Sequence, residues 1–233
     1  KDRGGSQTGV MAYSQEHARE WVTPLVAVET AERLLRNYRN DAATRQLVDD
    51  LDIFIIPSVN PDGGHYSFYD ANFQRKNMTN YCAPNNADPN RRNAWGVDLN
   101  RNFSVGSRFD GYDGASGSCT NDLFSGPEEL SEPEARNEVW LTEQFDNIRF
   151  AMNVHSYGGY FMWPPGAYID EGRITLPHAT VGEENYFWAS SSHILSAVQD
   201  WRGTAVWPGR TGPVADVLYS AAGNSADEHW YNG

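Results

Sequence analysis

The amino-acid sequence predicts an α/β protein with a mixed, mostly parallel twisted sheet and helices on both faces. Two observations lead to this fold class. Strand-like and helix-like segments alternate along the chain, as expected for α/β layering. The strand-like segments include a continuous apolar run, which is typical of strands buried in parallel sheets. The length of 233 residues fits a single domain, residues 1–233.

The first half of the chain contains one helix signal and one strand signal. Thr23 followed by Pro24 is typical of an N-cap with proline in the first turn. Apolar residues then recur at helical spacing: Ala27, Ala31, Leu34, Leu35 and Tyr38. Residues 51–56 are expected to form a central strand that Pro57 ends, and residues 60–64 form a turn cluster. Residues 65–126 are mostly irregular, and irregular segments of this length usually carry function or flexibility.

The second half contains three further elements. Ser131 and Glu134 match a capping box with Pro133 between them, which predicts a helix to about Phe145. Residues 148–154 are expected to be a buried strand that ends at His155, and ligands of open α/β sheets bind at that edge. A helix is expected from about residue 184 to residue 201. Its expected core residues are Trp188, Ile194, Leu195, Val198 and Trp201.

The composition excludes two classes of partner. Lys and Arg number 18 and Asp and Glu number 31, a formal charge of −13, which would repel nucleic-acid phosphates. No stretch approaches the roughly 18 apolar residues that a membrane-spanning helix needs.

Two segments carry residues that are suited to bind a metal. His17 and Glu20 lie three positions apart and would converge on one zinc ion in a helix or tight turn, although a solvated helix start is the alternative. His155 at the end of a strand would face a cleft, and its alternative is a hydrogen-bonded core histidine. We expect the other histidines at the surface: His65, His178, His193 and His229.

Two irregular segments carry cations. Arg101 lies between Asn100 and Asn102, and a guanidinium with flanking amides suits a carboxylate ligand; an Asx-rich turn with a surface arginine is the alternative. Arg75 and Lys76 form another pair, for which simple solvation is the alternative.

The cysteines, Cys82 and Cys119, lie in polar segments that favour a disulfide of a secreted protein over two buried thiols.

The chain resembles the zinc metallocarboxypeptidases of the pancreatic A and B type and their bacterial relatives. The resemblance rests on matching motifs in the family's order: HAREWVT at 17–23, NPDG at 60–63, FQRK at 73–76, GVDLNRNF at 96–103, HSY at 155–157, and Tyr219 with Gly223. It implies that His17, Glu20 and His155 bind one zinc ion. Cys82 and Cys119 lie where the family's disulfide lies.

The resemblance also implies roles for residues around the metal. Arg75 would stabilise the oxyanion, Asn100 and Arg101 would bind the substrate's C-terminal carboxylate, and Tyr219 would close over the substrate. Asp98 would accept a hydrogen bond from metal-bound His17. Arg19, Ser156 and Tyr157 would line neighbouring subsites.

The chain also departs from the family pattern. The family's general-base glutamate follows the mobile tyrosine loop, and Glu228 is too close to Tyr219 to match it. We therefore expect that residues 1–233 lack the family's first strands and its final strand and helix, bind zinc, and hydrolyse peptides poorly. Gln15 and Glu16 precede His17 where an apolar pair is more usual, and we expect Glu16 to be solvated. Ala226, with Leu218 and Ala221, fits a pocket for apolar C-terminal side chains.

The predicted function is that of a secreted, monomeric zinc carboxypeptidase acting on peptide or protein C-termini, without nucleic-acid or membrane partners. One alternative is a related zinc amidase or cell-wall peptidase on the same fold. The other is a non-catalytic, zinc-holding peptide-binding module.

Overall fold

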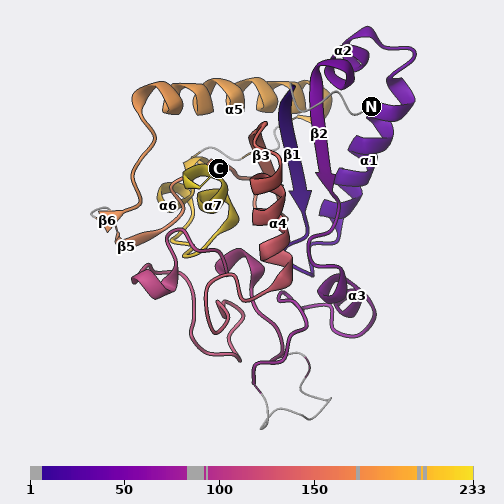
Figure 1. Ribbon diagram of the computed structural model, residues 1–233. Helices are drawn as coiled ribbons and strands as arrows, with labels where there is room; N and C mark the ends of the chain where they lie inside the picture. Colours follow the sequence, from indigo (N-terminus) through magenta and orange to yellow (C-terminus); the bar gives the residue numbers. More distant parts are fainter. Residues whose placement is uncertain are drawn as a thin grey trace.

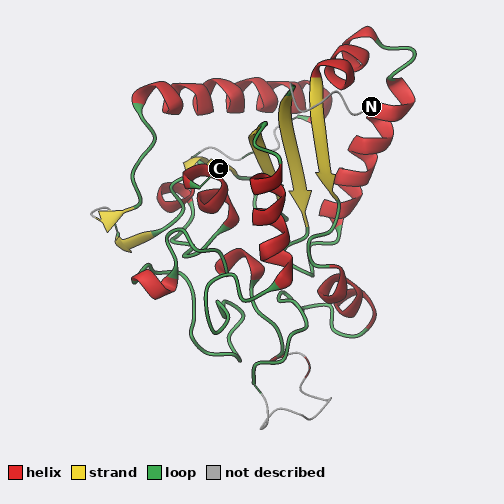
Figure 2. Cartoon of the chain, viewed as in Figure 1, coloured by secondary structure: helices red, strands yellow, loops and turns green. Residues whose placement is uncertain are grey.

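The structure is a computed structural model that describes residues 7–82, 92, 94–171, 174–203, 206 and 209–232. Figures 1 and 2 show how its helices and strands are arranged. In chain order the elements are β1 (Thr8–Ser14), α1 (Val22–Asn37), α2 (Ala42–Asp50), β2 (Leu51–Ile56), α3 (Pro61–Tyr69), η2 (Leu99–Arg101), η3 (Arg108–Asp110), α4 (Pro133–Gln144), β3 (Ile148–Val154), β4 (Phe161–Trp163), β5 (Tyr168–Asp170), β6 (Ile174–Thr175), α5 (Val181–Arg202), β7 (Thr211–Pro213), α6 (Val214–Val217) and α7 (Ser225–Tyr231).

The main sheet has the strand order β2-β1-β3, and both pairings are parallel. β4 pairs with β7 in parallel and β5 with β6 antiparallel. The predicted mixed, mostly parallel α/β fold is therefore confirmed.

The prediction that residues 51–56 form the central strand is wrong, because β1 lies in the centre and β2 lies at the edge of the described sheet. Helices α1 and α2 pack against β2, so an edge strand can be as apolar as a central one.

β3 has the predicted bounds but is not a buried strand. Phe150 is 43% exposed and Met152 is 42% exposed. Within the described residues β3 pairs with β1 alone, so its second edge has no neighbour there. Its carboxyl end still lies beside that of β1, because the two strands are parallel with Ser14 opposite Val154. This shared edge brings His155 close to the segment that follows β1.

Two local predictions differ from the structure, one at the start of α1 and one in the segment after β2. α1 begins at Val22 with Trp21 as its N-cap, and the Thr23 hydroxyl donates back to the Glu20 carbonyl rather than capping the helix. The predicted turn cluster at residues 60–64 starts helix α3, because the Asn60 side chain accepts the Gly63 amide and caps it.

The capping box predicted at Ser131 is also wrong, although the helix ends at Gln144 with Phe145 as its C-cap, close to the expected residue. Glu132 is the N-cap of α4, and no side chain on the helix caps it. Its backbone amide instead donates to the Asn102 side chain, which lies far away in sequence. A tertiary contact therefore replaces the local cap.

Helix α5 starts three residues before the expected position, at a complete capping box of Thr180 and Glu183. The predicted core residues of this helix are wrong. Trp188 is 43% exposed, Ile194 is 36% exposed and Trp201 is 81% exposed, while Leu195 and Val198 are half-buried. Helical spacing identifies an apolar face, but it does not establish that another element covers that face.

The hydrophobic core lies where β1 meets the loops after β2 and before η2. Its buried members are Met11, Tyr13, Val59 and Leu99. Polar contacts hold part of the irregular region that follows α3. Lys76 is 1% exposed, and its ammonium donates to the backbone carbonyls of Ala94, Cys119 and Asn121.

The disulfide between Cys82 and Cys119 is present, which confirms that prediction. In the part of the chain that the structure describes, no helix is long and apolar enough to cross a membrane.

Candidate metal centre

The segment that joins β1 to α1 carries most of the site. Gln15 has a φ of +58°, a left-handed conformation that turns the chain sharply at the end of β1. Its side chain holds the turn, because its amide donates to the Ala18 carbonyl and its oxygen accepts the Ser58 hydroxyl. The Ala18 amide in turn donates to the Arg75 carbonyl. This turn points Glu16 and His17 in different directions.

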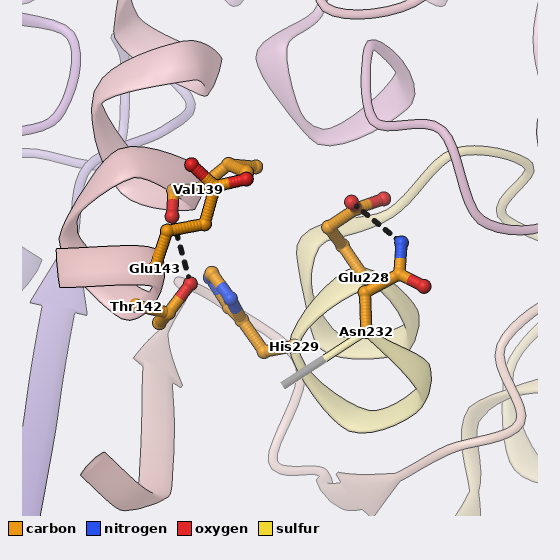
Figure 3. Close-up of a pocket in the computed structure, with 6 residues that line it drawn as sticks. All are labelled: Val139, Thr142, Glu143, Glu228, His229 and Asn232. Atoms are coloured by element: carbon orange, nitrogen blue, oxygen red, sulfur yellow. Dashed lines mark hydrogen bonds between the residues drawn. The ribbon is translucent and has the colours of Figure 1, made fainter. Parts of the chain in front are cut away.

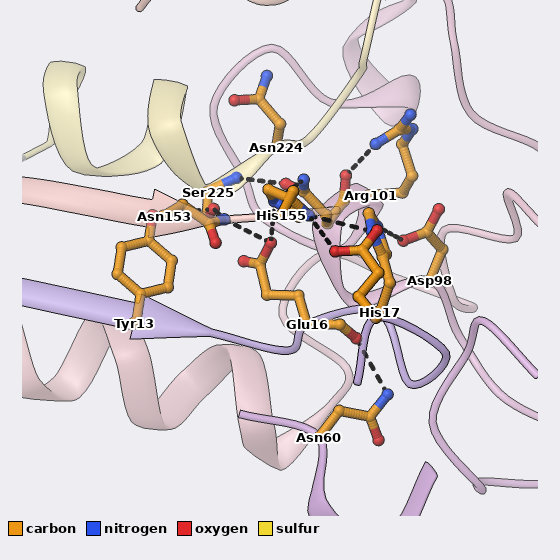
Figure 4. Close-up of polar contacts among 12 residues, drawn as sticks. Tyr13, Glu16, His17, Asn60, Asp98, Arg101, Asn153, His155, Asn224 and Ser225 are labelled. Atoms are coloured by element: carbon orange, nitrogen blue, oxygen red, sulfur yellow. Dashed lines mark hydrogen bonds and ion pairs between the residues drawn. The ribbon is translucent and has the colours of Figure 1, made fainter. Parts of the chain in front are cut away.

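Three side chains from two segments converge at the carboxyl ends of β1 and β3. Figure 4 shows two of them, His17 and His155, close together. His17 Nδ1 lies 2.7 Å from Glu20 Oε1. His155 Nδ1 lies 3.1 Å from His17 Nδ1 and 3.1 Å from Glu20 Oε2. The Ser156 amide donates to Glu20 Oε2 and fixes the carboxylate. The structure therefore brings together His17, Glu20 and His155.

This donor set fits a zinc ion. Two imidazole nitrogens and one carboxylate oxygen are a ligand combination of catalytic zinc sites, and they leave a coordination position for water or substrate. Ligands about 2.0–2.1 Å from a tetrahedral ion lie roughly 3.3 Å from one another. The spacings of 2.7 Å and 3.1 Å are close to this value. Each histidine also has a carboxylate near its second ring nitrogen, as metal-binding histidines usually do.

Asp98 joins His17 to Arg75. Its carboxylate is 0% exposed, with Oδ1 3.2 Å from His17 Nε2 and Oδ2 2.8 Å from Arg75 Nη2. The Arg75 Nε–H donates to the same Oδ2. Burial alone raises the pKa of Asp98, but Arg75, His17 and Arg101 outweigh it and hold that pKa well below its usual range. Asp98 is therefore ionised, is hydrogen-bonded to Arg75 and lies at ion-pair distance from His17.

The prediction that Glu16 is solvated is wrong. Glu16 is 0% exposed, and its Oε2 accepts the Asn153 amide at 2.6 Å and lies 3.2 Å from His155 Nε2. Despite burial, the bond to His155 lowers the pKa of Glu16. Burial also lowers the pKa of His155, but its bonds to Glu16 and Glu20 raise it to about 9. Nothing in the sequence marks Glu16, because its direction depends on the left-handed turn at Gln15.

Asn100, Arg101 and Tyr219 lie next to the cluster of His17, Glu20 and His155. Asn100 Oδ1 accepts the Ser225 amide, and Asn100 Nδ2 lies 3.2 Å from His155 Nε2. Arg101 is 2% exposed, and its Nε–H donates to the Gly114 carbonyl. Tyr219 is 51% exposed and interacts with the Arg101 guanidinium.

The other predicted substrate-binding residues differ in how far they are exposed. Arg19 is exposed and donates to the Phe73 carbonyl, and the Tyr157 side chain is fully exposed. Leu218 and Ala226 are half-buried, and Ala221 is buried.

His229 is not a surface histidine as predicted, whereas His65, His178 and His193 are exposed. Its side chain is only 7% exposed and lies 3.4 Å from Glu138, with its ring edge against Tyr13. Glu138 is itself buried, and burial together with Glu16 raises its pKa well above the usual value. A polar cavity of about 290 Å³ opens beside His229 between α4 and α7 (Figure 3). None of the residues that line it belongs to the metal centre.

Comparison with known proteins places this site in a family. The model of the family described as zinc carboxypeptidase matches residues 2–233. Carboxypeptidase A2 of Rattus norvegicus is 30% identical over 224 residues, which cover 96% of this chain and 48% of that protein. Carboxypeptidase O of Bos taurus is 28% identical over 212 residues, which cover 91% of this chain and 50% of that protein. The chain thus spans about half the length of the curated relatives it matches.

Solved structures share the fold. Carboxypeptidase A from Helicoverpa armigera superposes with a TM-score of 0.76 at 24% identity, over 97% of this chain and 50% of that chain. Thrombin-activatable fibrinolysis inhibitor superposes with a TM-score of 0.79 at 24% identity, over 98% of this chain and 54% of that chain.

Proposed function

The chain belongs to the zinc carboxypeptidase family, and from this premise we propose that the protein hydrolyses the C-terminal peptide bond of peptides or proteins. The observation that carries the proposal is the convergence of His17, Glu20 and His155 beside the buried cations Arg75 and Arg101. A metal centre next to fixed guanidinium groups suits a substrate that carries a free carboxylate near the bond to be cleaved.

His17, Glu20 and His155 would hold the zinc ion. When bound, zinc supplies a Lewis acid for the peptide carbonyl and lowers the pKa of a coordinated water. Asp98 orients the His17 ring and at the same time aligns the Arg75 guanidinium. Arg75 thereby donates to the carbonyl oxygen as negative charge develops there, which is the kind of electrostatic stabilisation that fixed donors provide.

Asn100 and Arg101 would recognise the C-terminal carboxylate. A guanidinium presents paired donors that match a carboxylate and not an internal amide. Tyr219, half-exposed above Arg101, would cover the bound substrate. Arg19, Ser156 and Tyr157 would contact residues on the amino-terminal side of the cleaved bond.

The substrate's C-terminal side chain would be apolar. Ala226, Leu218 and Ala221 offer no charge to a basic side chain. Asp227 follows Ala226 but is 0% exposed, and its carboxylate accepts the Gly166 amide and the Asn224 side-chain amide. These two donors engage the Asp227 carboxylate, so we do not assign it to a basic substrate side chain. The disulfide supports a secreted protein, because structural disulfides persist in oxidising compartments.

A test uses pairs of peptides that end in phenylalanine, as the free acid or as the amide. Zinc content, peptide binding by calorimetry and release of C-terminal residues by mass spectrometry are measured with and without a chelator. We expect stoichiometric zinc, binding of the acid at least tenfold tighter than the amide, and slow stepwise release that chelation abolishes, because no glutamate of this chain matches the family's general base.

Other outcomes identify other functions. Equal binding of acid and amide would favour the amidase alternative. Acid-specific binding without any release would favour the peptide-binding module. Failure to bind zinc would overturn the metal site and the proposed function together.

A further inference from the structure

Each of the two histidines of the metal centre has a buried carboxylate at its second ring nitrogen. Asp98 Oδ1 lies 3.2 Å from His17 Nε2, and Glu16 Oε2 lies 3.2 Å from His155 Nε2. Both carboxylate side chains are 0% exposed. The family resemblance assigns a role to Asp98, but Glu16 occupies a position where the family more often has an apolar residue. The Glu16 contact is therefore a feature of this chain that needs its own explanation.

We propose that Glu16 is a positioning residue that fixes the His155 ring with its proton on Nε2, so that Nδ1 is free to bind zinc. The inference rests on the proposed function, because it concerns the same metal centre. It follows from the two sides of the ring. Nδ1 faces Glu20 and His17, and Nε2 faces Glu16. In the zinc-bound ring, the nitrogen that binds the metal must lack a proton, so the remaining proton lies on Nε2 beside Glu16.

A second group competes for Nε2. Asn100 Nδ2 lies 3.2 Å from the same nitrogen, and the amide orientation is fixed because Asn100 Oδ1 accepts the Ser225 amide. An N–H donor at this place favours the ring tautomer with Nε2 unprotonated, which would put the proton on Nδ1. Glu16 favours a proton on Nε2, because its carboxylate lies at ion-pair distance from that nitrogen and a charge-assisted contact is about twice as strong as one between neutral groups. Glu16 therefore decides the competition in favour of metal binding.

Glu16 is itself held in place at its carboxylate and at its backbone (Figure 4). The Asn153 side chain on β3 donates to Oε2, and the Asn60 side chain donates to the Glu16 backbone carbonyl. Asn153 also donates to the Ser225 hydroxyl, next to the Asn100 anchor. A group held this firmly can impose an orientation on its neighbour, because little freedom is left for either partner to move.

The test compares Glu16→Gln with Glu132→Gln, a loss of another buried carboxyl that accepts from Asn77 and Tyr81 and contacts no proposed ligand. The zinc dissociation constant of the chain is measured by competition with a chromophoric chelator at pH 7.5. We expect Glu16→Gln to weaken zinc binding 10- to 100-fold, as loss of such outer partners usually does, and Glu132→Gln to change it less than twofold.

A second pair of variants isolates the tautomer. Glu16→Met removes the carboxylate without adding a donor, and Asn100→Ala added to Glu16→Met removes the competing donor. We expect the double variant to regain several-fold of the zinc affinity that Glu16→Met loses. In zinc-loaded wild type, proton–nitrogen NMR should show a slowly exchanging Nε2–H of His155 shifted downfield, and Glu16→Gln should lose that shift.

The outcomes separate this inference from the proposed function. If the wild type binds no zinc, both are overturned. If wild type and Glu16→Gln bind zinc equally and the His155 resonance does not move, the positioning role alone is overturned. Unfolding in the presence of a chelator shows whether each variant is folded. A stability loss without a change in zinc affinity would make Glu16 a purely structural residue.

Discussion

Replacing Asp98 by asparagine is the perturbation with the most clearly separable consequences. The substitution keeps the shape of the side chain but removes a charge that is buried between two partners. On one side, Arg75 donates two contacts to Oδ2, and on the other His17 Nε2 lies 3.2 Å from Oδ1. One change therefore disturbs a buried ion pair and a proposed metal ligand together.

The magnitudes follow from the burial of these groups. The Asp98 side chain is 0% exposed and the Arg75 side chain 10% exposed, so Arg75 would keep an unpaired charge that water barely reaches. Removing one partner of a buried pair costs about 3–5 kcal/mol of unfolding free energy. Loss of the carboxylate behind a metal-binding histidine weakens metal affinity about 10- to 100-fold, which corresponds to about 1.4–2.7 kcal/mol.

Two assays report these effects independently. Urea unfolding in the presence of a chelator measures the stability of the metal-free chain, and chelator competition measures zinc affinity under native conditions. Glu29→Gln is the control, because Glu29 forms only exposed ion pairs with Arg33 and Arg36 and should change stability by less than about 1 kcal/mol. If Asp98→Asn unfolds like the wild type and binds zinc within twofold of it, the assigned role of Asp98 is wrong.

Three further predictions concern other parts of the chain. Removing both cysteines should lower the unfolding free energy by about 4 kcal/mol, which is the chain-entropy value for the 37-residue separation of Cys82 and Cys119. Urea unfolding without reductant measures this loss, and a loss below about 1 kcal/mol would contradict the prediction. Burial raises the pKa of Asp227 to about 7 despite bonds from Asn224 and Gly166, so its contribution to stability is complete below about pH 4 and is lost as the pH rises through 7. Asp227→Asn should therefore gain stability relative to wild type by about 2 kcal/mol between pH 5 and pH 8, and parallel pH profiles would refute this. Lys76→Met leaves three backbone carbonyls without their donor and should destabilise the chain by about 3 kcal/mol, whereas an unchanged urea midpoint would show that those bonds contribute little.

The sequence predicts those parts of the fold that depend on local pattern. The strands at residues 51–56 and 148–154 have the expected bounds, because short apolar runs identify a strand whatever covers it. Their places in the sheet were not predictable, because that depends on neighbours distant in the chain. The start of α4 shows the same limit, since Asn102 rather than a neighbouring residue accepts the Glu132 amide.

The proposed metal-binding side chains could be selected from sequence because their types and order are distinctive. Glu16 and His229 could not, and both were expected at the surface. A lone glutamate or histidine is usually solvated, and its burial here depends on contacts from β3 and α4 that no local pattern encodes.

The turn at Gln15 explains how neighbouring residues come to serve different histidines. Glu16 reaches the far side of the His155 ring, whereas His17 faces Glu20. If β1 continued as a regular strand, successive side chains would alternate between the two faces of the sheet along one straight line. The left-handed conformation at Gln15 bends that path, and the Gln15 side chain holds the bend through Ala18 and Ser58. The metal centre therefore depends on a residue that does not contact any of the proposed ligands' binding atoms.

Because glycine adopts a positive φ without strain but has no side chain, Gln15→Gly should keep the turn and lose its anchors. Zinc affinity that falls in Gln15→Gly, with the fold intact, would show that the anchors and not the backbone conformation alone hold Glu16 and His17 in register.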